Sequence, residues 1–549
     1  MLARETGAIG DAVLRKEDRR LLTGLGRFSD DFRLEGELFA GLIRSPHAHA
    51  RILRIDTARA RALRGVLDVI TGADCAQLEP IAHSPLPSTR HDIRLGAPGG
   101  GEVFVGPHRL LPVDRVRYVG EPIAMVVATS RALAEDALEA LEIEYAPLAH
   151  VSDARAAVQA GAPAVWDEQP GNLFIESRFG DAVATAAEFA RAAHVVGASF
   201  HIQRVTAVTL EPRAALANFD RGTGRYTLYA GSGGAVRQKH ELARVLGIAP
   251  ERLRVISADV GGNFGARNSV YVEFALVLLA AQRLARPVRY VASRGEAMTS
   301  DYQGRDLASE IELALDADGR FLALRVANLS NVGAYCVSLS PLSKGSGLVT
   351  GSYAIPLASL VSRAAFTHTM STQAYRSSGR PEVTFAIERL IDIAATRTGI
   401  DRIELRRRNL VPADAMPYTN PIGMTYDSGT YASNMDLAMR LADWDGFAAR
   451  RTAARARGRL LGRGLANYVE SSIGAPRERA ELRLDVSERL RIVVGTQPSG
   501  QGHETSFAQV AATLLGVPVA AIDVVLGDPI SCRSVAARTP AARCATPRR

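Results

Sequence analysis

The sequence lacks the features of a membrane or secreted protein. Its 549 residues contain no apolar run of eighteen or more, and about 20 are needed for a helix to cross a bilayer. The amino terminus has no apolar core typical of a secretion signal, so we expect a cytoplasmic protein. The four cysteines form no Cys-x-x-Cys pair, which excludes a zinc ribbon or a conventional iron–sulfur ligand set and fits a reducing compartment.

Two nucleotide-binding signatures are also missing. No Walker motif occurs, and two glycine pairs that could begin a G-x-G-x-x-G fingerprint have Val236 and Thr505 where the third glycine belongs. A Rossmann dehydrogenase is therefore disfavoured. The net charge of +8 does not indicate nucleic-acid binding, because five arginines follow residue 528 without an acidic neighbour and the other basic residues are interleaved with acids.

What the sequence does contain is an internal repeat. Residues 231–259 recur as residues 500–528 without a gap, with matching Gly-x-Gly, Leu-Gly and final Asp positions. Each copy has the pattern of a strand, a glycine loop, a helix and a second strand. The first copy continues into another glycine loop at residues 261–265, whereas the second runs into a stretch of Arg, Ala and Pro. Two related units predict a large cofactor held between two related lobes.

Three loops are candidates for binding. Residues 261–265 (the Phe264 loop) and 498–502 (the Gly500 loop) follow strands, so their backbone N–H groups can approach an anion. Residues 375–380 (the Arg376 loop) place two arginines before a helix, a geometry suited to clamping an oxyanion or a carbonyl. The alternatives are that the glycines only make tight turns and that the arginines are solvated.

The length and the alternation of strands and helices predict several domains of the α+β (mixed α/β) class. A Pro/Gly/Asn-rich stretch begins at residue 412 and separates two lobes. We expect an N-terminal arm, a small α/β domain, a linker, a first lobe, a second lobe and a tail, at residues 1–20, 21–150, 151–172, 173–411, 412–528 and 529–549. The tail is expected to be disordered or frameshifted.

Local patterns predict particular elements. Residues 123–128 have the composition of a buried strand, and Ser130 is suited to cap the helix that follows. Residues 80–115 are rich in Pro, Gly and His and predict an extended loop. Residues 383–396 predict a helix with inward Phe385, Leu390, Ile391 and Ala394, and with Glu388, Arg389 and Asp392 at polar positions.

Several short stretches spread over residues 10–528 are distinctive as a set. They are RKED at 15–18, LLTG at 21–24, SPHAHA at 45–50, YVGEP at 118–122, EPR at 211–213, RRRNL at 406–410, GQG at 500–502, and the Phe264 and Arg376 loops. Together they resemble the molybdenum-binding large subunit of the xanthine dehydrogenase, aldehyde oxidase and carbon monoxide dehydrogenase family. The resemblance implies an α/β hammerhead domain followed by two molybdopterin-binding lobes, the second incomplete.

The resemblance also implies a cofactor, partners and a reaction. The cofactor is molybdopterin, often the cytosine dinucleotide form in bacteria, whose sulfurs rather than protein side chains hold the molybdenum. The reaction is hydroxylation of an electron-poor carbon, with water as the oxygen source. Electrons would leave through FAD and 2Fe-2S groups, for which this chain has no motif. A FAD-binding medium subunit and a 2Fe-2S small subunit are therefore the implied partners.

Residue roles can be carried over by position. The implied cofactor-binding residues are Gly233, Gly262, Asn263, Phe264, Gly265, Arg376, Gly500, Gln501 and Gly502, and the implied substrate-binding residues are Arg376, Ser377 and Asn268. Three departures bear on the substrate. Asn268 replaces a Glu of purine-type enzymes, Gly233 replaces a Gln of many relatives, and Ser377 and Ser378 replace the copper-binding cysteine of carbon monoxide dehydrogenases. An aldehyde or an aromatic N-heterocycle is favoured, and a carbon monoxide dehydrogenase-type chain is an alternative.

The end of the sequence departs furthest from the family pattern. The resemblance implies a Gly-x-Gly-Glu segment whose Glu is the general base, and none follows residue 528. No catalytic residue is therefore assigned. Losing such a base typically costs about 10²–10⁴-fold in rate. We expect a truncated second lobe with impaired catalysis, or a non-catalytic remnant or partner-binding fragment, and we expect residues 532–549 not to pack.

Overall fold

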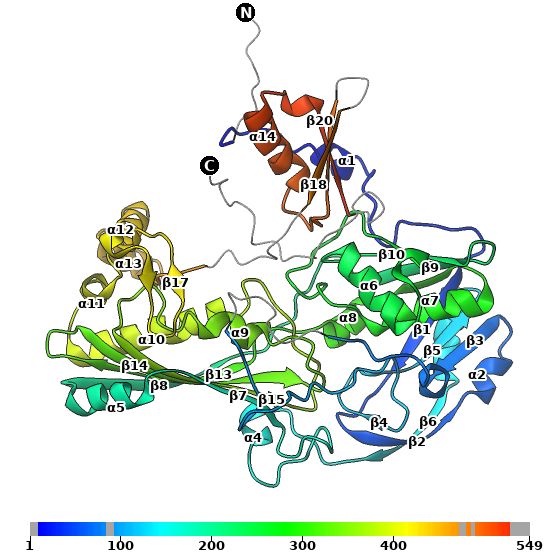
Figure 1. The fold of residues 1–549 in the computed structure, drawn as a ribbon, viewed down its shortest axis with the longest axis horizontal. Helices are drawn as coiled ribbons and strands as arrows, with labels where there is room; N and C mark the ends of the chain where they lie inside the picture. Colours follow the sequence, from blue (N-terminus) through cyan, green and yellow to red (C-terminus); the bar gives the residue numbers. More distant parts are fainter. Residues whose placement is uncertain (1–8, 84–92, 471–478, 485–488, 528–549) are drawn as a thin grey trace, which may run out of the picture.

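The computed structural model describes residues 9–83, 93–470, 479–484 and 489–527 (Figure 1). Two large sheets lie side by side, and a smaller three-stranded sheet with its helix α14 (His503–Leu515) stands apart from both. This arrangement confirms the expected mixed α/β class. The expectation that residues 532–549 do not pack concerns a stretch outside the described residues.

The larger sheet has seven strands in the order β11-β10-β9-β12-β1-β5-β3. Their bounds are Leu253–Ile256, Arg225–Ala230, Ala214–Asp220, Val288–Val291, Leu38–Arg44, Pro122–Ala128 and Val66–Thr71. Strands β1 and β12 pair in parallel, with Leu38 opposite Val288. The small α/β domain and the first lobe, which are far apart in the sequence, therefore share one continuous sheet.

The small α/β domain has the local structure that its sequence predicts. Every residue of β5 is buried, and Ser130 caps α3 (Arg131–Glu139) because its side chain accepts a hydrogen bond from the Leu133 N–H. The domain's other elements are β2 (Ala50–Asp56), β4 (Arg115–Val116), β6 (Glu142–Pro147), α2 (Ala58–Ala62) and η1 (Gly72–Cys75). In the described part of residues 80–115, only β4 and a bridge between Ile81 and His108 interrupt the expected loop.

The second large sheet has five strands in the order β7-β15-β14-β13-β8. They span Leu173–Gly180, Leu357–Phe366, Phe321–Gly333, Leu307–Leu315 and His194–Ile202. Helix α10 (Arg380–Thr398) lies on one face of this sheet and α5 (Ala182–Arg191) on the other (Figure 1). The core beneath α10 contains Leu390, Ile391 and Ala394, as predicted.

Two expectations for α10 are wrong. Phe385 is 45% exposed, and its ring packs edge-on against Phe200 with the centroids 5.4 Å apart. Glu388 is buried, because its carboxylate accepts hydrogen bonds from Arg406 Nε at 2.8 Å and from the Tyr353 hydroxyl at 2.5 Å. These buried partners satisfy the carboxylate, and helical periodicity alone cannot reveal them.

Residues 151–172 connect the two parts as a packed segment. Val165 and Trp166 are buried, and the Asn172 side chain accepts a hydrogen bond from Val165 N and donates to Ala157 O. Helix α4 (Ala154–Ala157) belongs to this segment. The other elements of the two lobes are α7 (Val272–Leu284), α8 (Arg294–Ser300), α9 (Ser340–Ser346), α11 (Arg402–Asn409), η3 (Ala413–Ala415), β16 (Tyr418–Thr419), β17 (Thr425–Tyr426), α12 (Tyr431–Leu441) and α13 (Phe447–Ala456).

The sequence repeat is also a structural repeat. The first unit is β10, α6 (Ala235–Val245), η2 (Pro250–Arg252) and β11; the second is β19 (Leu490–Val494), α14, η4 (Val519–Ala521) and β20 (Ile522–Leu526). In each unit the two strands are parallel, and an antiparallel strand, β9 or β18 (Ala480–Leu484), flanks the first. Strand β11 ends at Ile256, after which Ser257 N donates to Gly527 O and Asp259 N donates to Arg27 O.

Buried histidines predict a fold that loses stability in acid. Burial lowers the pKa of His108 to about 4 and that of His368 to about 3. In the unfolded chain both take up protons near pH ~6.5, so below that pH the unfolded state binds more protons and gains stability. We expect the free energy of unfolding, measured in urea, to fall by about 3 kcal/mol or more between about pH 7.5 and about pH 4.5.

A His108→Gln variant tests this assignment. His108 Nδ1 lies 2.8 Å from His83 Nε2, and its ring stacks on Tyr335 with the centroids 4.2 Å apart. Glutamine does not titrate, so the variant should lose less stability than the parent over the same pH range. An equal loss in parent and variant would show that other groups cause the acid sensitivity.

Candidate binding cleft

A cleft of about 410 Å³ lies where three parts of the chain meet. The N-terminal segment, residues 9–31, contributes one wall through Arg15, Glu17, Arg20, Leu21 and Phe28. The Phe264 loop forms the second wall and the Gly500 loop the third. The cleft therefore joins the loop that follows the first unit to the loop within the second.

The Phe264 loop approaches its neighbours so closely that only glycine fits at two positions. A Cβ on Gly265 would lie 2.0 Å from Ala374 O, and one on Gly261 would lie 2.4 Å from Glu211 Cβ. Asn263 holds the turn, because its Oδ1 accepts hydrogen bonds from Gly265 N and Arg267 N, both at 3.0 Å. Phe264, at φ +50° and 40% exposed, is left facing the cleft.

Glu211 anchors this loop, a role that the sequence did not assign. Its Oε2 accepts hydrogen bonds from Gly261 N at 2.8 Å and Arg267 Nη1 at 2.6 Å, and its Oε1 accepts one from Ser29 N at 2.9 Å. The carboxylate thus joins the N-terminal segment to the Phe264 loop. The EPR motif at residues 211–213 was the available sequence signal.

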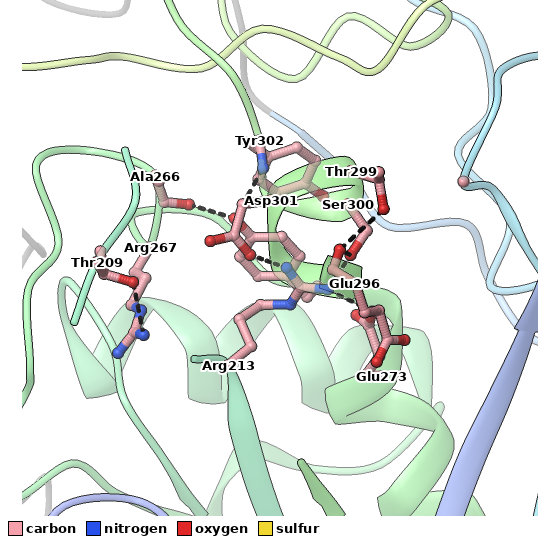
Figure 2. A network of polar contacts seen from close by, with 12 residues as sticks. Thr209, Arg213, Ala266, Arg267, Glu273, Glu296, Thr299, Ser300, Asp301 and Tyr302 are labelled. Atoms are coloured by element: carbon pink, nitrogen blue, oxygen red, sulfur yellow. Dashed lines mark hydrogen bonds and ion pairs between the residues drawn. The ribbon is translucent and has the colours of Figure 1, made fainter. Parts of the chain in front are cut away.

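Behind the loop lies a buried network of charges, which Figure 2 shows. Arg213 Nη2 donates to Glu273 Oε1 at 2.9 Å and to Ser300 Oγ at 2.8 Å, and Arg213 also pairs with Asp301. Arg44 of β1 donates to the same Glu273 oxygen at 2.6 Å. Burial opposes the charged form of Glu273, but the two arginines outweigh it and lower its pKa to about 2.

This network supports the cleft through Tyr271. The ring of Tyr271 lies under the Arg213 guanidinium, 4.3 Å from its carbon, and the Tyr271 hydroxyl donates to Ala266 O at 2.8 Å. Ala266 directly follows the Phe264 loop. The charges that bind the small α/β domain to the first lobe therefore also fix one end of the loop.

The Arg376 loop packs against the Phe264 loop. Arg376 N donates to Phe264 O at 2.8 Å, and Arg305 holds the other side by donating to Arg376 O at 2.8 Å and to Glu382 Oε2 at 2.8 Å. The Arg376 side chain is exposed and has no side-chain partner among the described residues. Ser377 lies beside it at φ +61°. The guanidinium is therefore free to meet a ligand.

Gly233, Asn263 and Asn268 form a group next to the Phe264 loop. Asn263 Nδ2 donates to Asn268 Oδ1 at 3.1 Å, and a Cβ on Gly233 would lie 2.2 Å from that oxygen. The asparagine pair thus occupies the space of a side chain at position 233. Because Asn263 Oδ1 accepts two backbone N–H groups, its amide orientation is fixed. Within the part of the chain that the structure describes, this leaves Asn268 with a free Nδ2 donor.

The Gly500 loop leads into the start of α14. Gly500 has φ +112° and open space where a Cβ would lie, while Gly502, at φ +76°, caps α14 without a side-chain hydrogen bond. The first N–H groups of the helix are suited to an anion. Gln501 does not line the cleft; its Oε1 accepts a hydrogen bond from Ser499 N within its own loop.

The cleft also contains charges that the sequence did not indicate. Glu17, Asp259 and Glu504 line it together with Arg15 and Arg20. Among the described residues no group of three or more His, Cys, Asp or Glu side chains could hold a metal ion. No helix in the described part of the chain is long and apolar enough to cross a membrane. Glycine backbone, an aromatic ring and two arginines around one cleft fit a large phosphate-bearing cofactor, whereas Gly233, Asn268, Arg376 and Ser377 do not line the cleft.

Three family models match the chain. Residues 23–149 match the aldehyde oxidase and xanthine dehydrogenase a/b hammerhead domain. Residues 165–410 and 437–545 each match a molybdopterin cofactor-binding domain. These matches confirm the hammerhead domain and the molybdopterin-binding lobes expected from the sequence.

Characterised relatives agree with these models. The nicotine 6-hydroxylase large subunit of Paenarthrobacter nicotinovorans is 35% identical over 94% of this chain and 64% of its own length. The carbon monoxide dehydrogenase large chain of Afipia carboxidovorans is 32% identical over 92% of this chain and 64% of its own. The structure of quinoline 2-oxidoreductase from Pseudomonas putida 86 is 34% identical, with a TM-score of 0.86 over 94% of this chain and 66% of that one. The chain thus spans about two thirds of its relatives' length.

Proposed function

Because the chain belongs to the family of molybdenum-binding large subunits of xanthine dehydrogenase, aldehyde oxidase and carbon monoxide dehydrogenase, we propose that it contributes the cofactor-binding cleft of a molybdenum hydroxylase. The observation that carries the proposal is the single cleft shared by the Phe264 and Gly500 loops. The favoured substrate is an aromatic N-heterocycle or an aldehyde.

The residues of the cleft suit this cofactor. The first N–H groups of α14 and the backbone of Gly500 would hold its phosphate groups, and Gly262 and Asn263 would lie against the pterin. When bound, the molybdenum centre would supply a two-electron oxidant for a hydroxylation in which water is the oxygen source. For each substrate oxidised, two electrons and two protons leave.

Three side chains would orient the substrate. The exposed face of Phe264 would pack against a planar ring. The free guanidinium of Arg376 would donate to a carbonyl oxygen or a ring nitrogen, and Asn268 Nδ2 would offer a second donor. Ser377 has a hydroxyl instead of the soft sulfur that copper prefers, which disfavours carbon monoxide as the substrate.

We also propose the cytosine dinucleotide form of the cofactor, a cytoplasmic location, and partner subunits that bind FAD and 2Fe-2S. The support for partners is that relatives carry the names nicotine 6-hydroxylase large subunit and 6-hydroxypseudooxynicotine dehydrogenase complex subunit gamma. The four cysteines of this sequence form no Cys-x-x-Cys pair, which supports the proposal that iron–sulfur ligands belong to another chain.

Cofactor content tests the proposal. The chain is expressed, with candidate partner subunits, in a host that makes the cytosine dinucleotide cofactor. Metal analysis should find about one molybdenum for each chain, and acid hydrolysis should release about one CMP, because one cleft holds one cofactor. The loaded protein should oxidise quinoline, nicotine or benzaldehyde with a dye as electron acceptor. A folded chain without molybdenum or CMP, from a host that loads a control hydroxylase, would refute the proposal.

An Arg376→Met variant tests the substrate-binding role of Arg376 separately from cofactor binding. The Arg376 side chain has no partner among the described residues, so the variant should keep its cofactor and unfold within about 0.5 kcal/mol of the parent. Its kcat/KM should fall roughly 10²-fold, because a charge-assisted donor to the substrate is lost. Unchanged kcat/KM would remove Arg376 from the site.

A further inference from the structure

One guanidinium bridges the two glycine loops of the cleft. Arg20, in α1 (Asp18–Leu22), donates through Nη2 to Glu504 Oε1 at 2.6 Å and through Nη1 to Asp259 Oδ2. Asp259 lies two residues before the Phe264 loop, and Glu504 is in the first turn of α14, two residues after Gly502. All three side chains line the cleft.

The backbone around Arg20 is held on both sides. On one side, Lys16 N donates to Thr505 Oγ1 at 2.8 Å, and the Thr505 hydroxyl donates to Glu17 Oε2 at 2.6 Å. On the other, Arg27 N donates to Asp259 Oδ2 at 2.7 Å. Residues 16–27 therefore span the distance from the second unit to the end of the first, and Arg20 lies in the middle of this span.

Arg20 offsets part of the negative charge around it. Asp259 and Glu504 are two negative groups facing a cleft whose glycine N–H groups favour an anion. Burial raises the pKa of Glu504, and the charge of Arg20 opposes that shift. Burial disfavours the charged form of Arg20, but its bonds to Asp259 and Glu504 outweigh burial and raise its pKa. A planar fork of donors can serve two carboxylates at once, which a single ammonium group cannot do as well.

We propose that Arg20 is a positioning residue: it fixes the separation of the Phe264 and Gly500 loops and offsets part of the negative charge of Asp259 and Glu504, so that a phosphate-bearing ligand binds between them. The identity of that ligand rests on the proposed function, but the bridge does not. The bridge depends only on three side chains from distant parts of the chain, which meet at the wall of one cleft.

An Arg20→Leu variant tests the bridge in the cofactor-free chain. Hydrogen exchange should quicken at least tenfold in residues 258–262 and in the first turn of α14, while the large sheets exchange as in the parent. Calorimetric affinity for inorganic pyrophosphate should fall at least tenfold. Arg19→Leu is the control, because Arg19 lies on the same helix but is exposed, and its side chain bonds to none of the described residues. It should match the parent in both measurements.

A triple variant, Arg20→Gln with Asp259→Asn and Glu504→Gln, separates charge from structure. It removes the carboxylates together with their partner, so pyrophosphate should bind at least threefold more tightly than to Arg20→Leu, yet more weakly than to the parent because the two loops are no longer joined and exchange stays fast. If the triple variant binds as weakly as Arg20→Leu, or if Arg20→Leu binds as well as the parent, the proposal is overturned. A parent that binds pyrophosphate but retains no molybdopterin would refute the proposed function and leave the role of Arg20 intact.

Discussion

An Arg213→Met substitution is expected to lower the free energy of unfolding by about 3–5 kcal/mol. The Arg213 side chain is 1% exposed, and those of its partners Glu273 and Asp301 are 2% and 4% exposed. Methionine matches the aliphatic stem of arginine but has no guanidinium, so it leaves Asp301 without its ion pair and Glu273 with Arg44 alone. Removing one member of a buried charge network costs more than the network contributes, because the remaining charges stay away from water.

Urea denaturation of the parent and the variant measures this effect. Arg54→Met is the matched control, because Arg54 pairs with Asp56 on the surface with 59% of its side chain exposed. The control should change stability by less than about 1 kcal/mol. A similarly small loss for Arg213→Met would mean that water reaches the network and that it does not hold the small α/β domain against the first lobe.

A Gly265→Ala substitution is expected to disrupt the cleft itself. The new Cβ would lie 2.0 Å from Ala374 O at a backbone φ of +105°, so the Phe264 and Arg376 loops must move apart. We expect stability to fall by about 2–4 kcal/mol and bound molybdenum and CMP to fall below a tenth of the parent's content. Thermal unfolding and metal analysis measure the two effects.

Gly516→Ala separates backbone strain from steric overlap. Gly516 also has a positive φ, +69°, at the end of α14, but nothing lies within 4 Å of its Cβ position. Its substitution should cost about 1 kcal/mol and leave the cofactor bound. If Gly265→Ala retains its cofactor as well as Gly516→Ala does, the close contact between the two loops is not what shapes the cleft.

Local features of the chain could be read from its sequence. The strand of β5, the Ser130 cap and both repeat units follow from patterns within about thirty residues, where apolar periodicity and glycine spacing act directly. The sequence predicts the Phe264 loop for the same reason, because its glycines lie within five consecutive residues. The meeting of that loop with the Arg376 and Gly500 loops followed from the repeat and the family resemblance.

Features that depend on distant partners could not be read in this way. Arg20, Asp259 and Glu504 look like three unrelated surface charges until the fold brings them together. Glu388 has the position of a solvated residue on α10, but Arg406 and Tyr353 make its burial tolerable. The parallel pairing of β1 with β12 joins residues far apart in the chain, and no local pattern indicates it.

That pairing restricts how this protein can be recombined with its relatives. A chimera with its junction between residues 150 and 165 would pair β1 of one parent with β12 of the other, so the side-chain packing around that pairing would combine two unmatched sequences. Arg44 would also be separated from its own Glu273, which lies on the other side of that junction. A segment exchange that is intended to transfer a new substrate preference from a relative should therefore replace residues 23–410 as one unit.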